Sequence, residues 1–259
     1  MNTRLKFLWM ALVLMVAVSG LVGCGGSSGG GNDDNEGVVT PGGAAEIIFL
    51  HHSTGGNIWD GGVPGWFEQN APQHSITEQW FPAAVDGNYP YDYWNLWVNR
   101  SGQDLTLETL TASYKMIIFK HCFPVSEIEA DTGNPDIASD AKRLENYYLQ
   151  YNALKAKLRE FPNNIFIVWT GAVELSSDID EGMAQRTRTF FDWVRTSWDE
   201  PGDNIHIFDF YALETEGTLY MQPEHASGEN DAHPNSAFAQ EVAPVFCQRI
   251  VDVIEGRAD

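Results

Sequence analysis

Short apolar runs alternate with longer amphipathic segments along most of this chain, and that alternation constrains the fold more than any other feature of the sequence. The runs have the length and the flanking turn residues of buried strands, whereas the longer segments repeat apolar residues at the spacing of one helix face. Strands that alternate with helices predict a parallel sheet with helices on both of its sides. The predicted strands are Glu46–His51, Lys115–His121, Ile165–Thr170 and Ile205–Phe210, with a weaker one at Trp94–Val98, and the predicted helices are Ala138–Phe161, Glu181–Trp198 and Ser236–Ile254.

The first residues of the chain have the pattern of a secretory signal: a basic start, an apolar run over 7–18 and small residues after it. The run is too short to span a bilayer comfortably. Leu-Val-Gly-Cys at 21–24 resembles the lipobox of bacterial lipoproteins, which implies cleavage before Cys24 and lipid on its thiol. The alternative is an ordinary secreted protein with a chance cysteine.

We therefore divide the chain into a signal peptide over 1–23, a tether over 24–44 and one folded domain over 45–259. The tether is rich in Gly, Ser, Asn and Asp and cannot bury a core, while the remainder has the size of one α/β domain. Lipid on Cys24 anchors such a protein to a membrane, so we expect a cell-envelope lipoprotein that faces the periplasm or the surface. Gly25, in place of an aspartate, favours the outer membrane.

The chain is strongly acidic, with 36 acidic and 15 basic residues and a formal net charge of −21. Such a charge repels nucleic acid and other anionic polymers, which excludes them as ligands that the protein grasps. The charge identifies no substrate, and it is typical of a protein that stays soluble in a salty or acidic exterior.

Two cysteines, Cys122 and Cys247, lie in the predicted domain. Outside the cytoplasm such a pair can be oxidised to a disulfide. Cys122 follows a predicted strand and Cys247 lies in the last predicted helix, a placement that also suits two buried thiols. The sequence favours two free thiols and leaves the disulfide open.

Chemically active side chains follow the predicted strands at their carboxyl ends, where ligands bind in sheets of this kind. Ser53 follows the first strand, and His233 lies in Asn-Asp-Ala-His-Pro-Asn just before the last helix. A hydroxyl nucleophile and an imidazole base are two parts of an acyl-transfer site, and donors for the developing oxyanion are the third. The backbone amides of Ser53 and Gly102 are the predicted donors, since glycine lets a substrate oxygen approach the backbone closely.

The order of these residues resembles that of the SGNH, or GDSL-like, hydrolases. In that family the nucleophilic serine ends the first strand, a glycine follows the second, an asparagine follows the third, and Asp-x-x-His precedes the last helix. Asn-Arg-Ser-Gly at 99–102 is similar to the glycine block, and the segment 230–235 is similar to the histidine block. The resemblance extends over about residues 46–255. It implies a flavodoxin-like α/β/α sandwich with a mainly parallel five-stranded sheet, and hydrolysis of carboxylic esters without a cofactor.

Two departures from the family pattern concern the surroundings of the nucleophile. The usual Gly-Asp before the serine is His51-His52 here, and we expect one of these rings to pack beneath the sheet and the other, assigned as His52, to line the pocket. The place of the third-strand asparagine falls near Cys122, whose thiol is a weak hydrogen-bond donor. His121 or Lys120 is therefore expected to help bind the oxyanion.

The third departure concerns the residue that orients the histidine. Asn230 lies three positions before His233, where the family has its aspartate, and Asp231 lies two positions before it. An asparagine can orient an imidazole but cannot stabilise imidazolium by charge. We predict that Asp231 is the partner of His233, with a Ser–His dyad oriented by Asn230 as the alternative.

The predicted function is that of an extracytoplasmic serine esterase acting on small-molecule or polysaccharide esters, such as O-acyl groups of a carbohydrate. Residues 57–93 are predicted to form an irregular loop system, in which Trp59, Trp66 and Trp80 either bind substrate or only plug the loops. The missing asparagine and the shifted aspartate motivate the alternative of a non-catalytic surface module that binds glycans.

Two further interpretations stay open at this level. Ser53 before Thr-Gly-Gly is also a good helix N-cap, and most such serines have no other role. The histidines at 51, 52, 121 and 233, together with Asp231, are residue types that ligate zinc, which motivates a metal-dependent hydrolase. Adjacent side chains diverge on a strand, however, and no His-x-x-x-His spacing is present, so no metal is expected.

Overall fold

The computed structural model describes residues 46–83, 87–101 and 105–257. These residues belong to one compact unit, Pro41–Asp259. The predicted signal peptide, the tether, Cys24 and Gly102 fall outside the described residues, so the interpretations that rest on them remain predictions. No helix among the described residues is both long enough and apolar enough to cross a membrane.

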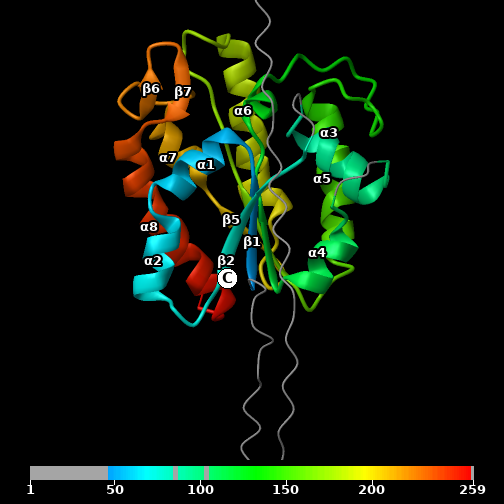
Figure 1. The fold of residues 1–259 in the computed structure, drawn as a ribbon. Coiled ribbons are helices and arrows are strands. Elements are labelled where there is room, and N and C mark those ends of the chain that lie inside the picture. Colours follow the sequence, from blue (N-terminus) through cyan, green and yellow to red (C-terminus); the bar gives the residue numbers. More distant parts are fainter. Residues whose placement is uncertain (1–45, 84–86, 102–104, 258–259) are drawn as a thin grey trace, which may run out of the picture. The chain divides into compact units, whose positions relative to one another are not determined.

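Five parallel strands form the central sheet (Figure 1). They are β1 (Ile47–His51), β2 (Ile76–Trp80), β3 (Met116–Phe119), β4 (Ile165–Trp169) and β5 (Ile205–Phe208). The order across the sheet is β2-β1-β3-β4-β5, so the chain reverses its direction of winding at β1. This is the flavodoxin-like order, and it confirms the predicted sheet. The carboxyl end of β1 is the switch point at which such sheets bind ligands.

Helices cover both faces of this sheet and complete the predicted three-layer sandwich (Figure 1). One face carries α1 (Ser53–Asp60), α2 (Val63–Asn70) and α8 (Ser236–Ile254), and the other carries α3 (Pro90–Tyr93), α4 (Leu107–Ser113), α5 (Leu144–Leu158) and α6 (Glu181–Trp193). The shorter elements are the π-helical turns η1 (Trp94–Val98) and η3 (Val194–Trp198), the 3-10 helix η2 (Phe123–Ser126), α7 (Phe210–Thr215), and a hairpin of β6 (Ala226–Gly228) and β7 (Asp231–Pro234).

Aromatic side chains pack on both faces of the sheet. On one face Phe49 of β1 lies 5.0 Å, centroid to centroid, from Phe246 of α8. On the other face Phe119 of β3 packs edge-on against Trp97 of η1 at 5.2 Å. All positions of β1 and β3 are buried, as expected for strands covered on both sides, so these apolar runs carried a clear signal in the sequence.

The weak strand predicted at Trp94–Val98 is wrong. This segment is the π-helical turn η1, which continues α3, and Trp94 and Trp97 are three residues apart and both buried, as on one side of a helix. The second strand of the sheet is β2, within the region predicted to be irregular. The strand at Ile76–Trp80 lies at the edge of the sheet and is largely exposed, so it lacks the apolar run of a buried strand.

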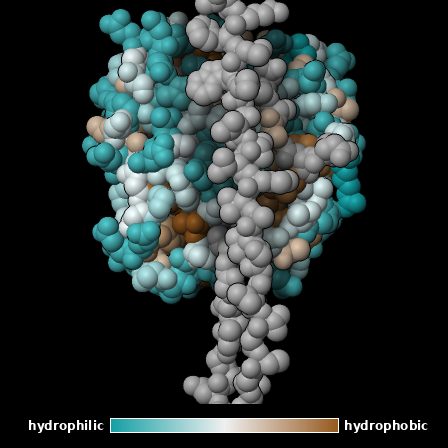
Figure 2. All heavy atoms as spheres, viewed as in Figure 1, coloured by the Kyte–Doolittle hydropathy of each residue, from teal (hydrophilic) through white to brown (hydrophobic). Residues whose placement is uncertain are grey.

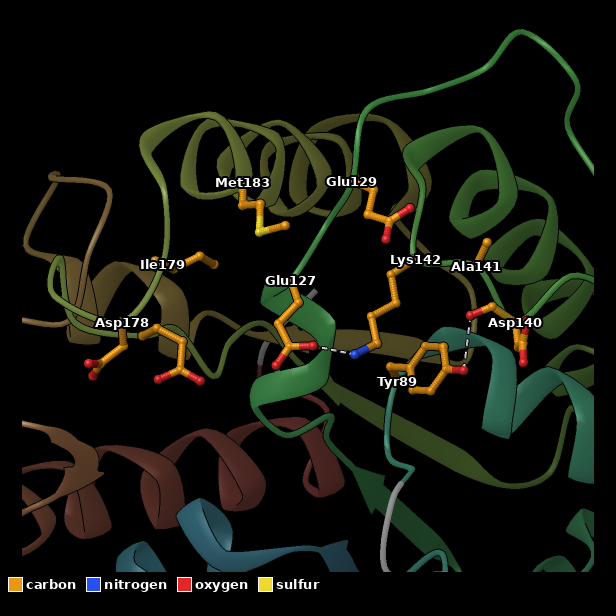
Figure 3. A pocket seen from close by; sticks show the side chains of 10 residues that line it. Tyr89, Glu127, Glu129, Asp140, Ala141, Lys142, Asp178, Ile179 and Met183 are labelled. Carbon is orange, nitrogen blue, oxygen red and sulfur yellow. Dashed lines mark hydrogen bonds and ion pairs between the residues drawn. The ribbon is translucent and has the colours of Figure 1, made fainter.

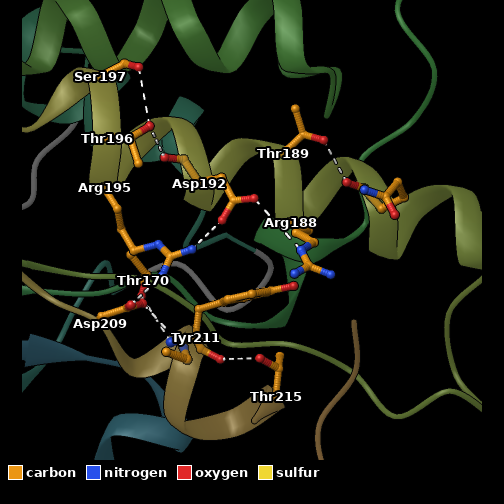
Figure 4. Close-up of polar contacts among 12 residues, drawn as sticks. Thr170, Arg188, Thr189, Asp192, Arg195, Thr196, Ser197, Asp209, Tyr211 and Thr215 are labelled. Carbon is orange, nitrogen blue, oxygen red and sulfur yellow. Dashed lines mark hydrogen bonds and ion pairs between the residues drawn. The ribbon is translucent and has the colours of Figure 1, made fainter. Parts of the chain in front are cut away.

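A polar network ties the carboxyl ends of β4 and β5 to the helices (Figure 4). Thr170, directly after β4, donates its hydroxyl hydrogen to Asp209 Oδ1 at 2.7 Å. Asp209 also caps α7 by accepting the backbone N–H of Ala212, and it pairs with Arg195 of η3 at 2.7 Å. Thr170 is thus engaged in holding β4 and α7 together.

The visible face of the molecule in Figure 2 is mainly hydrophilic outside its grey atoms, as the acidic composition predicts. Among the described residues, the large apolar side chains that stand exposed are Trp80, Leu149 and Val245, on three different elements. Trp80 is 51% exposed and ends β2, at the same edge of the sheet as Ser53.

Candidate active site

Ser53 is the first residue of α1, at the point where β1 gives way to a helix. The N-cap position is taken by His52, whose side chain makes no capping bond, so Ser53 does not serve as the cap. The backbone N–H groups in the first turn of a helix have no intrahelical partner. The Ser53 N–H is therefore available to a ligand, and the helix dipole favours negative charge there.

His233 reaches Ser53 from the hairpin that precedes α8. Its Nε2 lies 2.8 Å from Ser53 Oγ, across 180 residues of sequence. Asn235 fixes the end of the hairpin, because its side chain accepts the N–H of Phe238 at 2.9 Å and so caps α8. The ring of Phe123 meets the imidazole edge-on, with 5.0 Å between the centroids, and limits its rotation.

Asp231 holds the other nitrogen of the imidazole. Its Oδ1 lies 2.6 Å from His233 Nδ1 and also accepts the backbone N–H of His233 at 3.1 Å. These bonds, the one to the ring foremost, lower the pKa of the Asp231 carboxyl, which stays ionised at neutral pH. Asn230 is exposed in the turn between β6 and β7. Of the two candidates in the sequence, Asp231 is the one that the structure places against the ring.

Cys122 lies beside Ser53, at the place where the resemblance to the SGNH pattern predicts an asparagine. Its Sγ is 3.6 Å from Ser53 Oγ, and the residue is buried. The backbone N–H of Cys122 donates to the carbonyl oxygen of Asn88 at 3.0 Å, which leaves the thiol as the group that this residue can offer to a substrate. Cys122 and Cys247 are both buried and free.

His121 and His52 do not line an open pocket, contrary to expectation. His121 is fully buried with Nε2 2.6 Å from the Tyr151 hydroxyl, and burial holds its pKa well below the usual value. His52 is also buried: its Nε2 lies 2.7 Å from the carbonyl oxygen of Pro82, and its ring stacks on Trp80 at 4.3 Å. Each ring is thus held in packing by these contacts and is not exposed to solvent.

The described residues contain no group of three or more His, Cys, Asp or Glu side chains arranged to hold a metal ion. The histidines near this edge instead make separate hydrogen bonds. His51 Nε2 lies 2.6 Å from Glu78 Oε2, and burial lowers the pKa of His51 to about 4. His52 is bound to the Pro82 carbonyl oxygen, His121 to Tyr151 and His233 to Asp231, so each histidine of the sequence cluster has a different partner.

A cavity of about 550 Å³ lies beside η2, and its lining residues include none of Ser53, Asp231 and His233 (Figure 3). Glu127 on its wall directly follows η2, whose Phe123 touches His233. Burial, together with the charges of Asp178, Glu127 and Asp231, raises the pKa of Glu174 on the same wall to about 7. The wall carries more acidic than basic side chains, which disfavours anions in the cavity. The cavity is lined by Tyr89, Glu127, Glu129, Asp140, Ala141, Lys142, Glu174, Asp178, Ile179 and Met183.

The chain is similar in fold to a solved structure, although no protein-family model and no curated protein sequence matches the chain. A gut microbial diltiazem-metabolizing enzyme matches with a TM-score of 0.50 and 13% identity, over 79% of this chain and 46% of that one. A GDSL-like lipase from Bacteroides thetaiotaomicron matches with a TM-score of 0.44 and 11% identity, over 80% of this chain and 86% of that one. The chain thus spans about half the length of the first of these proteins. At 13% identity, the likeness to the first of these proteins is one of fold.

Proposed function

We propose that this protein is a serine ester hydrolase of the SGNH type. The observation that carries the proposal is the hydrogen-bonded series of three side chains, with 2.8 Å from Ser53 Oγ to His233 Nε2 and 2.6 Å from His233 Nδ1 to Asp231 Oδ1. A nucleophile, a base and a carboxylate that orients the base are the parts of a catalytic triad, which is recognised by geometry rather than by sequence position.

The geometry gives each residue of the triad a role in two successive acyl transfers. Ser53 Oγ attacks the ester carbonyl while His233 Nε2 takes its proton. Asp231 keeps the remaining ring proton on Nδ1 and stabilises the imidazolium that forms. The imidazolium then protonates the leaving alcohol, and a water molecule, activated by the same ring, releases the acid from the acyl-enzyme.

The Ser53 N–H and the Cys122 thiol are the donors that flank the nucleophile and would face the oxyanion. The thiol is the weaker of the two, and the amide of Gly102 remains a predicted third donor. One strong donor contributes a factor of about 10² to 10³ in kcat to reactions of this type. With few and weak oxyanion donors, turnover is expected to be fastest for esters with good leaving groups, which need less stabilisation of the oxyanion.

The substrate is proposed to be a small acyl ester, on a small molecule or on a neutral carbohydrate of the cell envelope. The exposed Trp80 and the acidic cavity support this choice, because an indole favours flat apolar or sugar surfaces and carboxylates disfavour anions. We also propose that the protein is located in the cell envelope and is anchored there by lipid on Cys24. The weak donor at Cys122 favours one alternative, a module that binds glycans without turnover.

A panel of nitrophenyl esters from acetyl to octanoyl tests the proposed function. We expect saturable hydrolysis, fastest for the short acyl groups, with a rate that is unchanged after treatment with a chelator. Loss of activity in the chelator would point to a metal-dependent hydrolase. Binding of envelope glycans that Ser53→Ala leaves unchanged, with no hydrolysis of any ester, would instead favour the non-catalytic module.

The two candidate partners of His233 can be separated by substitution. Asp231→Asn keeps the size of the side chain but removes the charge and favours the wrong ring tautomer, so we expect kcat to fall by about 10²- to 10⁴-fold. Asn230→Ala is the matched control and should leave kcat close to that of the wild type, since this side chain lies in an exposed turn. A larger loss in Asn230→Ala than in Asp231→Asn would assign the orienting role to the asparagine.

A further inference from the structure

The side chain of Lys120 packs against the first turn of α1, which begins at Ser53. Lys120 follows β3 and is fully buried. A Cβ atom added to Gly55 of α1 would lie 2.9 Å from Lys120 Cδ and 2.4 Å from His51 Cβ. Position 55 therefore has room for glycine alone, because the lysine stem and the helix backbone lie in direct contact.

The ammonium group of Lys120 is bound to the residue next to the nucleophile. Lys120 Nζ donates to the hydroxyl of Thr54, which is itself fully buried, and to the carbonyl oxygen of His121. The backbone of Lys120 is held as well, since the Tyr93 hydroxyl donates to its carbonyl oxygen at 2.9 Å. The lysine thus links the end of β3 to the start of α1 through contacts at both of its ends.

The first turn of α1 is weak without this link. Its sequence is Ser-Thr-Gly-Gly, and Gly55 and Gly56 have poor helix propensity. Its N-cap residue, His52, provides no side-chain bond to the free N–H groups. Burial of an ammonium is costly and is retained where hydrogen bonds compensate for it, here those to Thr54 and to the His121 carbonyl oxygen.

We propose that Lys120 is a positioning residue for the nucleophile, an inference that rests on the proposed esterase function. Its bond to Thr54 fixes the first turn of α1, so that Ser53 Oγ stays within reach of His233 and the Ser53 N–H points at the oxyanion. A displacement of about 1 Å in such an arrangement can lower the rate by about 10²-fold. The Lys120 ammonium is fully buried and bound to Thr54 and the His121 carbonyl oxygen, so it acts through Thr54 and not as the oxyanion donor that the sequence suggested.

Substitutions at both ends of the bond test the proposal. Lys120→Met keeps the unbranched stem and removes the ammonium, and Thr54→Val keeps the shape of threonine and removes the acceptor. We expect each to lower kcat by about 10- to 100-fold with little change in KM. Thr54→Ser keeps the hydroxyl and should retain most of the wild-type kcat. If Thr54 mattered only for the space that its side chain fills, Thr54→Val would retain kcat instead.

Lys155→Met is the matched control. Lys155 is another buried lysine, in α5, and its ammonium is bound to the Trp198 carbonyl oxygen and to Glu200 rather than to α1. We expect it to lower the melting temperature without lowering kcat. Should Lys120→Met fail to fold, the Thr54→Val and Thr54→Ser pair decides the question by itself.

The positioning role is overturned if a folded Thr54→Val variant has the kcat of the wild type, or if only its KM changes. In that case the esterase function still stands, provided that Ser53→Ala abolishes activity. Equal losses in Thr54→Val and Thr54→Ser would also overturn the positioning role, because the hydroxyl would then have no part. A wild-type protein that hydrolyses no ester removes both the esterase and the positioning role.

Discussion

Replacing Ser53 by alanine is expected to lower kcat for ester hydrolysis by roughly 10⁴- to 10⁶-fold. The substitution removes the atom that attacks the carbonyl and leaves the binding surface and the oxyanion donors in place. The Ser53 hydroxyl does not cap α1, and the side chain is only half-buried, so the free energy of unfolding should change by about 1 kcal/mol or less. Steady-state kinetics and a thermal melt of the same preparation measure the two effects.

Ser236→Ala is a matched control for that substitution. Ser236 is also the first residue of a helix, α8, whose cap is Asn235, and it is exposed. We expect wild-type kinetics in this variant. An esterase that kept more than about a tenth of its kcat in Ser53→Ala would need a different nucleophile, because the residual activity of triad enzymes without their serine is far smaller.

His233→Ala is the second substitution with a large expected effect, a fall in kcat of roughly 10⁴- to 10⁶-fold. Without the imidazole, the Cys122 thiol is the neighbour that Ser53 Oγ keeps among the described residues, and a thiol is a poor acceptor for the serine proton. The residues of a triad act as one unit, so the double variant Ser53→Ala, His233→Ala should be no slower than either single variant. Steady-state kinetics of the three variants give this comparison.

His225→Ala controls for the loss of a histidine in the same part of the chain. Its ring stacks on Phe238 at 4.0 Å and lies 3.1 Å from Glu216, away from the nucleophile. We expect some loss of stability and a wild-type kcat. Losses that multiply in the double variant Ser53→Ala, His233→Ala would show that the two residues act separately, which contradicts the proposed relay of the proton.

The fold could be predicted where burial leaves a clear pattern in the sequence. The strands β1, β3, β4 and β5 are short apolar runs, and the predicted helix Ser236–Ile254 has the same bounds as α8. The edge strand Ile76–Trp80 was missed because half-exposed strands mix apolar and polar residues. The apolar segment Trp94–Val98 was mistaken for a strand because periodicity cannot separate a short buried strand from a short buried helix.

The juxtaposition of Ser53 and His233 follows from the topology, because parallel strands bring their carboxyl ends to one edge. The directions of individual side chains do not follow from it. His52 and His121 turn into packing, while Phe123, one residue after Cys122, turns toward His233. The choice between Asn230 and Asp231 depends on the conformation of the turn after β6. The contact between Lys120 and Thr54 depends on the close packing of Lys120 against α1, which only glycine at position 55 allows.

Covalent labelling by a fluorophosphonate, followed by mass spectrometry of the peptides, tests the central claim most directly, because the reagent reacts with a serine only when a base activates it. We predict one adduct per chain, on Ser53, that is absent in His233→Ala. A wild-type protein that stays unlabelled while properly folded, or that carries the adduct on another residue, would contradict the assignment of Ser53 and His233 as nucleophile and base.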